Sequence, residues 1–181
     1  MKAKRYHEII SGQARGKGAA LVRLVLSVVA FFYSFAIGVR NLLYDWKLLP
    51  RKSAPCPVVS IGNITAGGTG KTPCVIFVVR KLIARGAKPA VVTRGYGPPL
   101  QADEVPPNVV ASGGRFGEEV ALLARELPQI PIVVDPNRAR GAAKAVAEHG
   151  ADVVVLDDGF QHRRLKRDLD IVLIDAMRPF G

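Results

Sequence analysis

Residues 61–72 of this chain read IGNITAGGTGKT, and they follow the apolar pair Val58-Val59. A buried strand, a glycine-rich turn and a helix that opens on Lys71-Thr72 form the arrangement of a phosphate-binding P-loop. Polyphosphates are bound by backbone N–H groups that converge at the positive end of a helix, and glycines leave that backbone accessible. We therefore predict that the chain binds a nucleoside triphosphate.

The residues of this loop have expected roles toward ATP. Lys71 would contact the β- and γ-phosphates, and the Thr72 hydroxyl would join the ligands of Mg²⁺. The usual pattern is G-x-x-x-x-G-K-[ST], and this chain has threonine at its first position. An ordinary glycine-rich turn is the alternative, which the strand before it and the helix after it argue against. The predicted ATP-binding residues are Thr65, Ala66, Gly67, Gly68, Thr69, Gly70, Lys71 and Thr72.

Downstream of the P-loop, continuous Val/Ile runs alternate with helical patterns. Strands that are buried on both faces of a parallel sheet have such uninterrupted apolar runs. Their order predicts an α/β fold, a P-loop NTPase-like and mostly parallel sheet with helices on both faces. The predicted strands are 58–61, 90–93, 132–134, 153–156 and 171–174, and the predicted helices are 73–85, 118–126 and 138–148.

Two adjacent aspartates, Asp157 and Asp158, directly follow a predicted buried strand. Ligands bind at the carboxyl ends of parallel strands, and an acid placed there in a P-loop protein is typical of a Walker B magnesium site. We therefore predict that one of the two aspartates holds Mg²⁺, directly or through water, and both are candidate metal ligands, with a turn or capping role as the alternative. Asp135 and Asp175 also end predicted strands, and for them ion pairing or capping competes equally with function.

Further polar groups lie near the predicted strand ends. Glu118 opens a predicted helix, where the helix dipole stabilises a carboxylate, but it is also a candidate general base. His162 follows the aspartates and could act in catalysis or bind substrate. Arg94 and Tyr96 are separated by one glycine, which suggests a loop shaped around a ligand. A basic run is either a solvent-exposed face or a binding surface for acidic lipid or phosphate; it comprises Arg163, Arg164, Lys166 and Arg167.

The N-terminal part is strongly basic and contains a long apolar run. Residues 1–52 hold ten Lys or Arg against two acidic residues, in a chain of net charge +11. Residues 24–39 carry no charge, and apolar neighbours extend this run to about 20–44. We predict a membrane helix here, with a helix lying in the interface and a buried core helix as alternatives. Basic residues beside an apolar run favour an anionic membrane over nucleic acid as partner.

The sequence thus divides into two parts. Residues 1–52 form the basic segment with the membrane helix at about 20–44, and residues 53–181 form the P-loop core. The proline-containing stretch 47–57 is interpreted as the linker between them. Because ATP is found on the cytoplasmic side, the P-loop predicts a cytoplasmic core. The two cysteines have neither metal-ligand spacing nor the pattern of a disulfide framework.

Three motifs, in this order behind a membrane segment, resemble those of the tetraacyldisaccharide 4'-kinases, the lipid A 4'-kinases of Gram-negative envelopes. They are NITAGGTGKTP at 63–73, TRGYG at 93–97 and DDGFQH at 157–162. The family has threonine in place of the first Walker glycine, as this chain has at Thr65, and the DDGFQH run is the most specific of the three. The resemblance covers about residues 20–181.

The resemblance implies transfer of the ATP γ-phosphate to the 4'-hydroxyl of a lipid A disaccharide 1-phosphate precursor at the inner membrane. ATP and Mg²⁺ are the implied cofactors. The membrane helix would keep the enzyme next to an acylated substrate that does not leave the bilayer. We expect no nucleic acid or protein partner. The expected catalytic groups are Lys71, Glu118, Asp158 and His162. The expected substrate contacts are Arg94, Tyr96 and Gln161.

The chain departs from the family pattern in two respects. The family has Gly-Asp-Glu after the long loop, with the aspartate taken as part of the catalytic base, whereas this chain has Gly117-Glu118-Glu119. Glutamate is one methylene longer and can still act as a base. The family also continues well past Gly181, into a subdomain that contributes a catalytic histidine and closes over the nucleotide. We therefore expect residues 1–181 alone to bind nucleotide weakly and to turn over little or nothing.

Two other classes of function share some of these features. A membrane-associated P-loop ATPase that acts as a switch or positioning protein would need the same loop and acids but no sugar-lipid acceptor. A non-catalytic membrane or nucleic-acid binding module would use only the basic N-terminus. That module predicts that Lys71→Ala changes nothing and that DNA binding is sensitive to salt.

Overall fold

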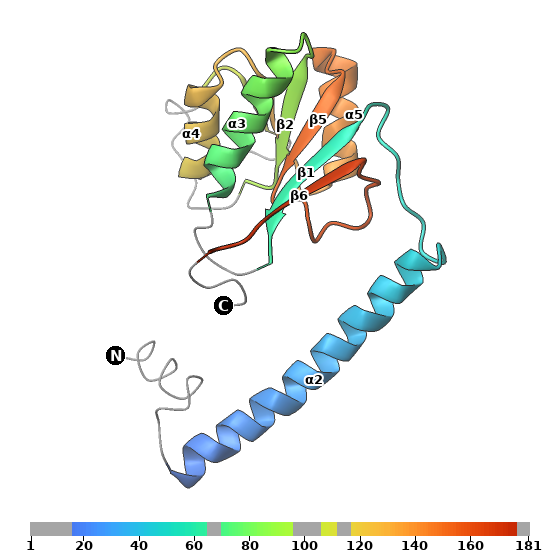
Figure 1. Ribbon diagram of the computed structural model, residues 1–181, viewed down its shortest axis with the longest axis vertical. Coiled ribbons are helices and arrows are strands. Elements are labelled where there is room, and N and C mark those ends of the chain that lie inside the picture. The colour runs from blue at the N-terminus through green and yellow to red at the C-terminus, as the bar shows by residue number, and fades with distance from the viewer. Residues whose placement is uncertain (1–15, 65–69, 96–105, 112–116, 177–181) are drawn as a thin grey trace. The chain divides into compact units, whose positions relative to one another are not determined.

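The computed structural model describes residues 16–64, 70–95, 106–111 and 117–176, and the chain divides into two compact units between Pro50 and Arg51. The first unit contains one long helix, α2 (Lys17–Asp45), whose 29 residues extend over about 43 Å (Figure 1). Among the described residues it is the one helix with the length and hydropathy to cross a membrane. Its most apolar window is not buried inside the protein, which argues against a buried core helix.

The second unit is built on a six-stranded parallel sheet with strand order β3-β4-β2-β5-β1-β6. Its strands are β1 (Val58–Asn63), β2 (Pro89–Thr93), β3 (Val109–Ala111), β4 (Ile132–Val134), β5 (Val153–Asp157) and β6 (Leu169–Leu173). The strand that leads into the P-loop therefore lies beside the strand that ends in the aspartates, and Ile61 pairs with Asp157. This arrangement confirms the predicted α/β fold.

Helices cover both faces of the sheet, as expected for strands with uninterrupted apolar runs (Figure 1). On one face, α3 (Lys71–Ile83) and α4 (Glu118–Glu126) enclose a core that includes Ile61, Val79 and Leu123. On the other, α5 (Arg138–His149) covers a core that includes Val154 and Ala145. Each large apolar side chain buried there stabilises the fold by about 1.5–3 kcal/mol.

Two helices begin at the carboxyl edge of the sheet through identifiable local devices. Gly70 precedes α3 with φ of 78°, a left-handed conformation that glycine adopts without a steric penalty. The Asn137 side chain caps α5 by accepting a hydrogen bond from the Arg140 backbone N–H at 3.2 Å. Both helix N-termini are thereby fixed beside the strand ends, where anions are favoured.

Some boundaries differ from the sequence expectations. The short edge strand β3 was not predicted, and β6 begins at Leu169 rather than at 171. The expected linker 47–57 is not wholly irregular, because Lys52 forms a parallel bridge with Leu165. Leu165 is 1% exposed, so the bridge joins Lys52 to a residue that is anchored in the core of the second unit.

Candidate functional site

The site predicted from the sequence lies where β1, β2 and β5 end and α3 begins. Gly70, Lys71 and Thr72 stand at the start of α3, and Asp157 ends β5. The P-loop residues Thr65, Ala66, Gly67, Gly68 and Thr69 lie outside the described residues, as does Tyr96. What the structure brings together is therefore the lysine of the loop and the two aspartates.

Lys71 is held between two neighbours. Its Nζ donates a hydrogen bond to Asn63 Oδ1 at 3.1 Å and lies 3.9 Å from Asp158 Oδ1. The Lys71 side chain is 22% exposed and that of Asp158 is 49% exposed, so water screens part of this ion pair. Asn63, at the end of β1, was not among the predicted site residues, although its position just before the glycine-rich loop was the available signal.

Asp157 is a buried acid with few compensating contacts. Its residue is 6% exposed, and Thr93 Oγ1 donates a hydrogen bond to Asp157 Oδ2 at 3.2 Å. Burial raises the pKa of the Asp157 carboxyl, and the charges of Glu119 and Asp158 raise it further. Thr93 and Arg138 oppose this shift without cancelling it. The ionised carboxylate is thus destabilised until a cation or proton reaches it.

The residue types at this edge fit a magnesium ion that is shared with phosphate oxygens. Mg²⁺ prefers oxygen ligands, keeps several waters and needs only one or two carboxylates beside a nucleotide. Asp157 and Asp158 supply carboxylates, and Thr72 supplies a half-buried hydroxyl in the first turn of α3. In the described segments no group of three or more His, Cys, Asp or Glu could hold a metal by itself. The donors therefore suit a metal that arrives with its nucleotide.

A backbone hydrogen bond and close packing hold the turn after β5 against β1. Asp158 has φ of 52°, a left-handed conformation that is uncommon for a non-glycine residue. The next residue, Gly159, donates its backbone N–H to the Ile61 carbonyl at 3.0 Å. A Cβ at Gly159 would lie 2.6 Å from Leu156 Cβ and 2.8 Å from Ser60 Oγ, so only glycine fits. Such strain persists where the surrounding structure enforces it, which is common at functional sites.

Arg138 connects two strand ends from beneath the site. It is 2% exposed, and its guanidinium donates hydrogen bonds to the Asp157 carbonyl at 2.9 Å and the Asp135 carbonyl at 3.3 Å. Its charge also lowers the pKa of Asp157. From the sequence, Arg138 was expected only to begin a helix, because an arginine in that position is usually exposed.

Asp135 has a structural role. Its carboxylate accepts hydrogen bonds from Arg140 Nε at 2.7 Å and from the Asn137 backbone at 2.7 Å. Although burial acts to raise its pKa, the Arg140 and Asn137 hydrogen bonds outweigh this and the pKa of Asp135 is lowered. The ion pairing and capping alternative accounts for this residue.

His162 lies in the turn that follows the aspartates. Its backbone N–H donates to the Gly159 carbonyl at 2.9 Å, and the residue is half-buried. Burial lowers the pKa of the His162 imidazole, and the positive charges of Arg138, Arg94, Arg164 and Arg167 lower it further. The imidazole is therefore neutral at pH 7. Arg94 is thus close enough to act on His162, while Gln161 beside it is exposed.

The acidic pair Glu118-Glu119 forms the first turn of α4, and both residues are exposed. Glu119 acts on Asp157 by raising its pKa, so this helix N-terminus is near the aspartates. The sequence analysis selected Glu118 as the candidate base. Its neighbour Glu119 is a second carboxylate near the same edge of the sheet.

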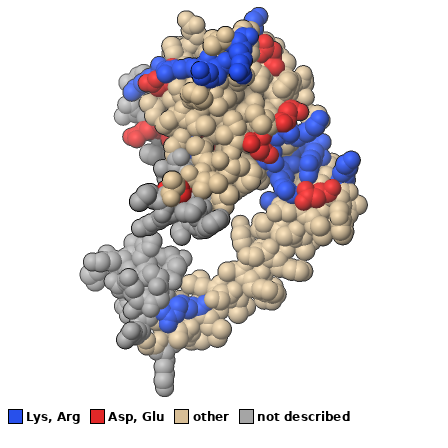
Figure 2. All heavy atoms as spheres, viewed as in Figure 1, with Lys and Arg blue, Asp and Glu red and all other residues tan. Residues whose placement is uncertain are grey.

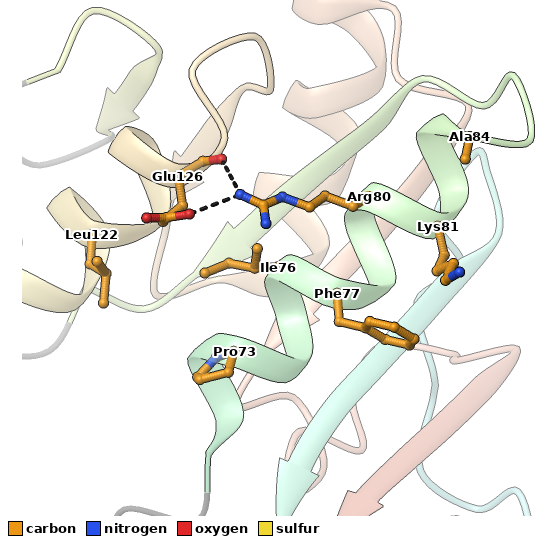
Figure 3. Close-up of a pocket in the computed structure, with 8 residues that line it drawn as sticks. All are labelled: Pro73, Ile76, Phe77, Arg80, Lys81, Ala84, Leu122 and Glu126. Carbon is orange, nitrogen blue, oxygen red and sulfur yellow. Dashed lines mark hydrogen bonds and ion pairs between the residues drawn. The ribbon is translucent and has the colours of Figure 1, made fainter.

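A separate groove of about 600 Å³ runs between α3 and α4 (Figure 3). Arg80 points across it, and its Nη2 donates to Glu126 Oε2 at 2.8 Å. Phe77 and Leu122 are exposed along it. None of the predicted site residues lines this groove, and its mostly apolar wall does not suit a polyphosphate.

The chain is similar to a family of kinases over most of its length. A family model described as tetraacyldisaccharide-1-P 4'-kinase matches residues 22–181. A tetraacyldisaccharide 4'-kinase from Syntrophus aciditrophicus (strain SB) is 46% identical over 165 residues, which cover 87% of this chain and 43% of that protein. One from Anaeromyxobacter sp. (strain Fw109-5) is 44% identical over 173 residues, 94% of this chain and 47% of that protein.

A solved structure agrees with the fold. The crystal structure of LpxK from Aquifex aeolicus in complex with ATP has a TM-score of 0.70 and 34% sequence identity. The match covers 83% of this chain and 48% of that chain. This chain spans about half the length of the curated relatives that it matches.

Proposed function

Because this chain belongs to the tetraacyldisaccharide-1-P 4'-kinase family, we propose that it is the nucleotide-binding part of a kinase of lipid A biosynthesis. The reaction is transfer of the γ-phosphate of ATP to the 4'-hydroxyl of a tetraacyldisaccharide 1-phosphate. The observation that carries the proposal is the meeting of Lys71 and Asp158 at 3.9 Å, beside the end of β5. This proximity places a P-loop lysine, which contacts phosphates, next to a Walker B acid, which holds Mg²⁺, and phosphoryl transfer from ATP uses both groups.

On this proposal the N-terminus of α3 receives the phosphates, together with the loop from Thr65 to Gly70. Backbone N–H groups and the helix dipole stabilise their negative charge. Lys71 leaves Asp158 to contact the β- and γ-phosphates, while Asn63 keeps its ammonium oriented at 3.1 Å. Orientation of this kind reduces the entropic cost of reaching the transition state.

Thr72, Asp157 and Asp158 would hold Mg²⁺ with the nucleotide. When bound, the ion neutralises charge that develops on the transferred phosphoryl group. The buried Asp157 carboxylate, whose pKa is raised by burial, would gain a cation that adds to the partial compensation from Arg138. Thr93 holds that carboxylate by the hydrogen bond to Oδ2.

The acceptor hydroxyl needs a group that takes its proton. Glu118 is the proposed base, at the N-terminus of α4 where both carboxylates of the pair are exposed to an incoming substrate. Because the pKa of His162 is lowered, its imidazole is neutral at pH 7, and one ring nitrogen can accept a proton. Arg94, Tyr96 and Gln161 are proposed to contact the phosphorylated sugar or the nucleotide.

Membrane association is supported by α2, an apolar helix of 29 residues, and by the family. We place the protein at the inner membrane with its P-loop unit on the cytoplasmic side, where ATP is available. A lipid with four acyl chains is essentially absent from water, so anchoring the enzyme in the same bilayer raises the effective concentration of its substrate.

The test is transfer of labelled γ-phosphate from ATP to a detergent-dispersed disaccharide 1-phosphate. Residues 1–181 are compared with a chimera that continues into the remaining half of the Syntrophus relative. Each is accompanied by Lys71→Ala and by Lys81→Ala, a matched control because Lys81 is an exposed lysine near the other end of the same helix. We expect the chimera to form product and Lys71→Ala to reduce transfer by at least a hundredfold, whereas Lys81→Ala leaves it unchanged.

ATP hydrolysis that depends on Lys71 but yields no phosphorylated disaccharide from either chain would overturn the kinase assignment and favour a P-loop ATPase switch. Equal behaviour of Lys71→Ala and Lys81→Ala would overturn the assignment of the nucleotide site itself. Nucleotide binding by residues 1–181, measured by fluorescence titration, separates these two failures.

A further inference from the structure

A basic cluster lies on the second unit where the chain enters it. Figure 2 shows Lys and Arg side chains gathered beside the segment that leads into β1, with acidic side chains among them. None of these basic groups is assigned a contact with ATP or with the acceptor, although Arg164 and Arg167 act on the pKa of His162. The members of the basic cluster are Arg51, Lys52, Arg163, Arg164, Lys166 and Arg167.

Main-chain pairing holds the two halves of the basic cluster together. The Lys52 N–H donates to the Arg164 carbonyl at 2.8 Å, and the Lys166 N–H donates to the Lys52 carbonyl at 2.8 Å. Leu165 between them is 1% exposed. Because side chains alternate along an extended segment, burial of Leu165 turns Arg164 and Lys166 outward, and both are exposed. The fold therefore presents these charges from a fixed backbone.

The basic cluster keeps a positive excess despite nearby acids. Asp170 lies 3.3 Å from the Arg167 guanidinium, and Asp168 lies 4.0 Å from the Lys166 ammonium. Lys166 and Arg167 thus each have a carboxylate close by. Burial lowers the pKa of Arg167; Asp170 opposes this shift, and the charges of Arg163 and Arg51 add to it. A surface that concentrates like charge in this way gains free energy when an anion binds it.

The covalent chain limits how far the basic cluster can be from the membrane helix. Arg51 follows Asp45, the last residue of α2, by six residues. Six extended residues reach at most about 20 Å, so only a short segment of chain separates Arg51 from the end of α2. Trp46 and Leu48, in the intervening segment, are 65% and 64% exposed. Exposed apolar and aromatic side chains followed by basic ones are typical of the membrane interface.

We propose that the basic cluster is a docking surface for the anionic phospholipid head groups of the bilayer that holds α2. Head-group phosphates bind to Arg164, Lys166 and Arg163 at the surface, whereas Arg167 remains tied to the turn after β5 through the Gly159 carbonyl at 3.2 Å. Docking would hold the P-loop unit against the leaflet and restrict the freedom that the linker otherwise allows.

The test is partitioning of the full chain onto phosphatidylcholine vesicles and onto vesicles with one quarter phosphatidylglycerol. The cluster variant is Arg163→Gln/Arg164→Gln/Lys166→Gln. The matched control is Lys81→Gln/Arg85→Gln/Lys88→Gln, which removes the same charge from exposed positions at the end of α3 and the turn after it. All three proteins keep α2 and the basic N-terminus, so only the enhancement by phosphatidylglycerol is compared.

Each basic residue near an anionic surface strengthens binding by about fivefold, so three removed charges predict a loss of enhancement slightly above a hundredfold. We expect this loss in the cluster variant alone, and we expect 0.5 M salt to abolish the enhancement in wild type. Equal losses in both variants would show that net charge, not this surface, attracts the lipid, and no loss in either would also overturn the proposal.

A short DNA duplex serves as a second probe. Loss of DNA binding in the cluster variant with its phosphatidylglycerol enhancement intact would assign the surface to nucleic acid instead. Circular dichroism melting of all three proteins identifies any variant that does not fold.

Discussion

Replacing Thr93 by valine tests the electrostatics of the predicted metal site. Thr93 Oγ1 donates to the buried Asp157 Oδ2 at 3.2 Å, and valine keeps the shape of threonine without the hydroxyl. A hydrogen bond to a charged group contributes about 1.5–3 kcal/mol, against about 0.5–1.5 kcal/mol for a neutral pair. We take values within these ranges, about 2 kcal/mol when Asp157 is ionised and about 1 kcal/mol when it is protonated.

The pH dependence has a defined sign. Asp157 has a raised pKa, so its folded value lies above the reference of 3.8 and the folded state holds its proton longer than the unfolded state. Stability therefore falls as pH rises from 3.8 through the folded pKa, and it stays lower above it. Thr93→Val removes a hydrogen bond that favours the charged form of Asp157, so the pKa of Asp157 in the folded state rises further. The pH range over which the stability falls therefore extends to higher pH.

The assay is urea unfolding in detergent, followed by circular dichroism at pH 4 and pH 8. We expect Thr93→Val to cost about 2 kcal/mol at pH 8 and about 1 kcal/mol at pH 4, and Thr93→Ser, which keeps the hydroxyl, to cost less at pH 8. In an Asp157→Asn background the pH dependence of the Thr93→Val cost should disappear. A cost that is the same at both pH values, or identical for valine and serine, would refute the reasoning.

Three further predictions follow from other contacts at the site. Gly159→Ala should destabilise the chain by about 1–3 kcal/mol in thermal melts, because its Cβ would overlap buried atoms, whereas Gly18→Ala, with nothing within 4 Å, should not. The His162 imidazole should titrate below pH 6.5 by NMR, and Arg164→Gln should raise that midpoint; a midpoint at or above 6.5 would contradict the assigned environment. Asn63→Ala should weaken ATP binding by about three- to tenfold in a fluorescence titration, because the lysine ammonium loses its orienting bond; unchanged affinity would show that this bond does not matter.

The sequence predicted the elements of the sheet better than their order. Strands such as β5 are recognisable because uninterrupted Val/Ile runs leave no other way to bury both faces. The edge strand β3 has only three residues, too few for a pattern, and it follows a long loop. The insertion of β5 between β1 and β2 is set by long-range packing, which no local pattern encodes.

Within the site, residues with a chemical signature were predictable and residues with a supporting role were not. Lys71 and Asp157 belong to motifs whose chemistry dictates their types and spacing. Arg138 was missed because its burial depends on two strand-end carbonyls that only the folded sheet brings within reach. Asn63 likewise contacts Lys71 across the glycine-rich loop, at 3.1 Å. Thr93 contacts Asp157, which is distant in sequence, at 3.2 Å.

The position of β1 between two other strands of the sheet has a consequence for folding during translation. Val58 pairs with Val154, and Val59 pairs with Leu169. The strands that pair with the two edges of β1 therefore lie about 100 residues further along the chain. At the usual rate of translation these partners emerge roughly 5–20 s later. During that delay both edges of this apolar strand have unpaired backbone N–H and C=O groups. Until β5 and β6 have emerged, β1 is therefore a segment of the nascent chain at risk of aggregation.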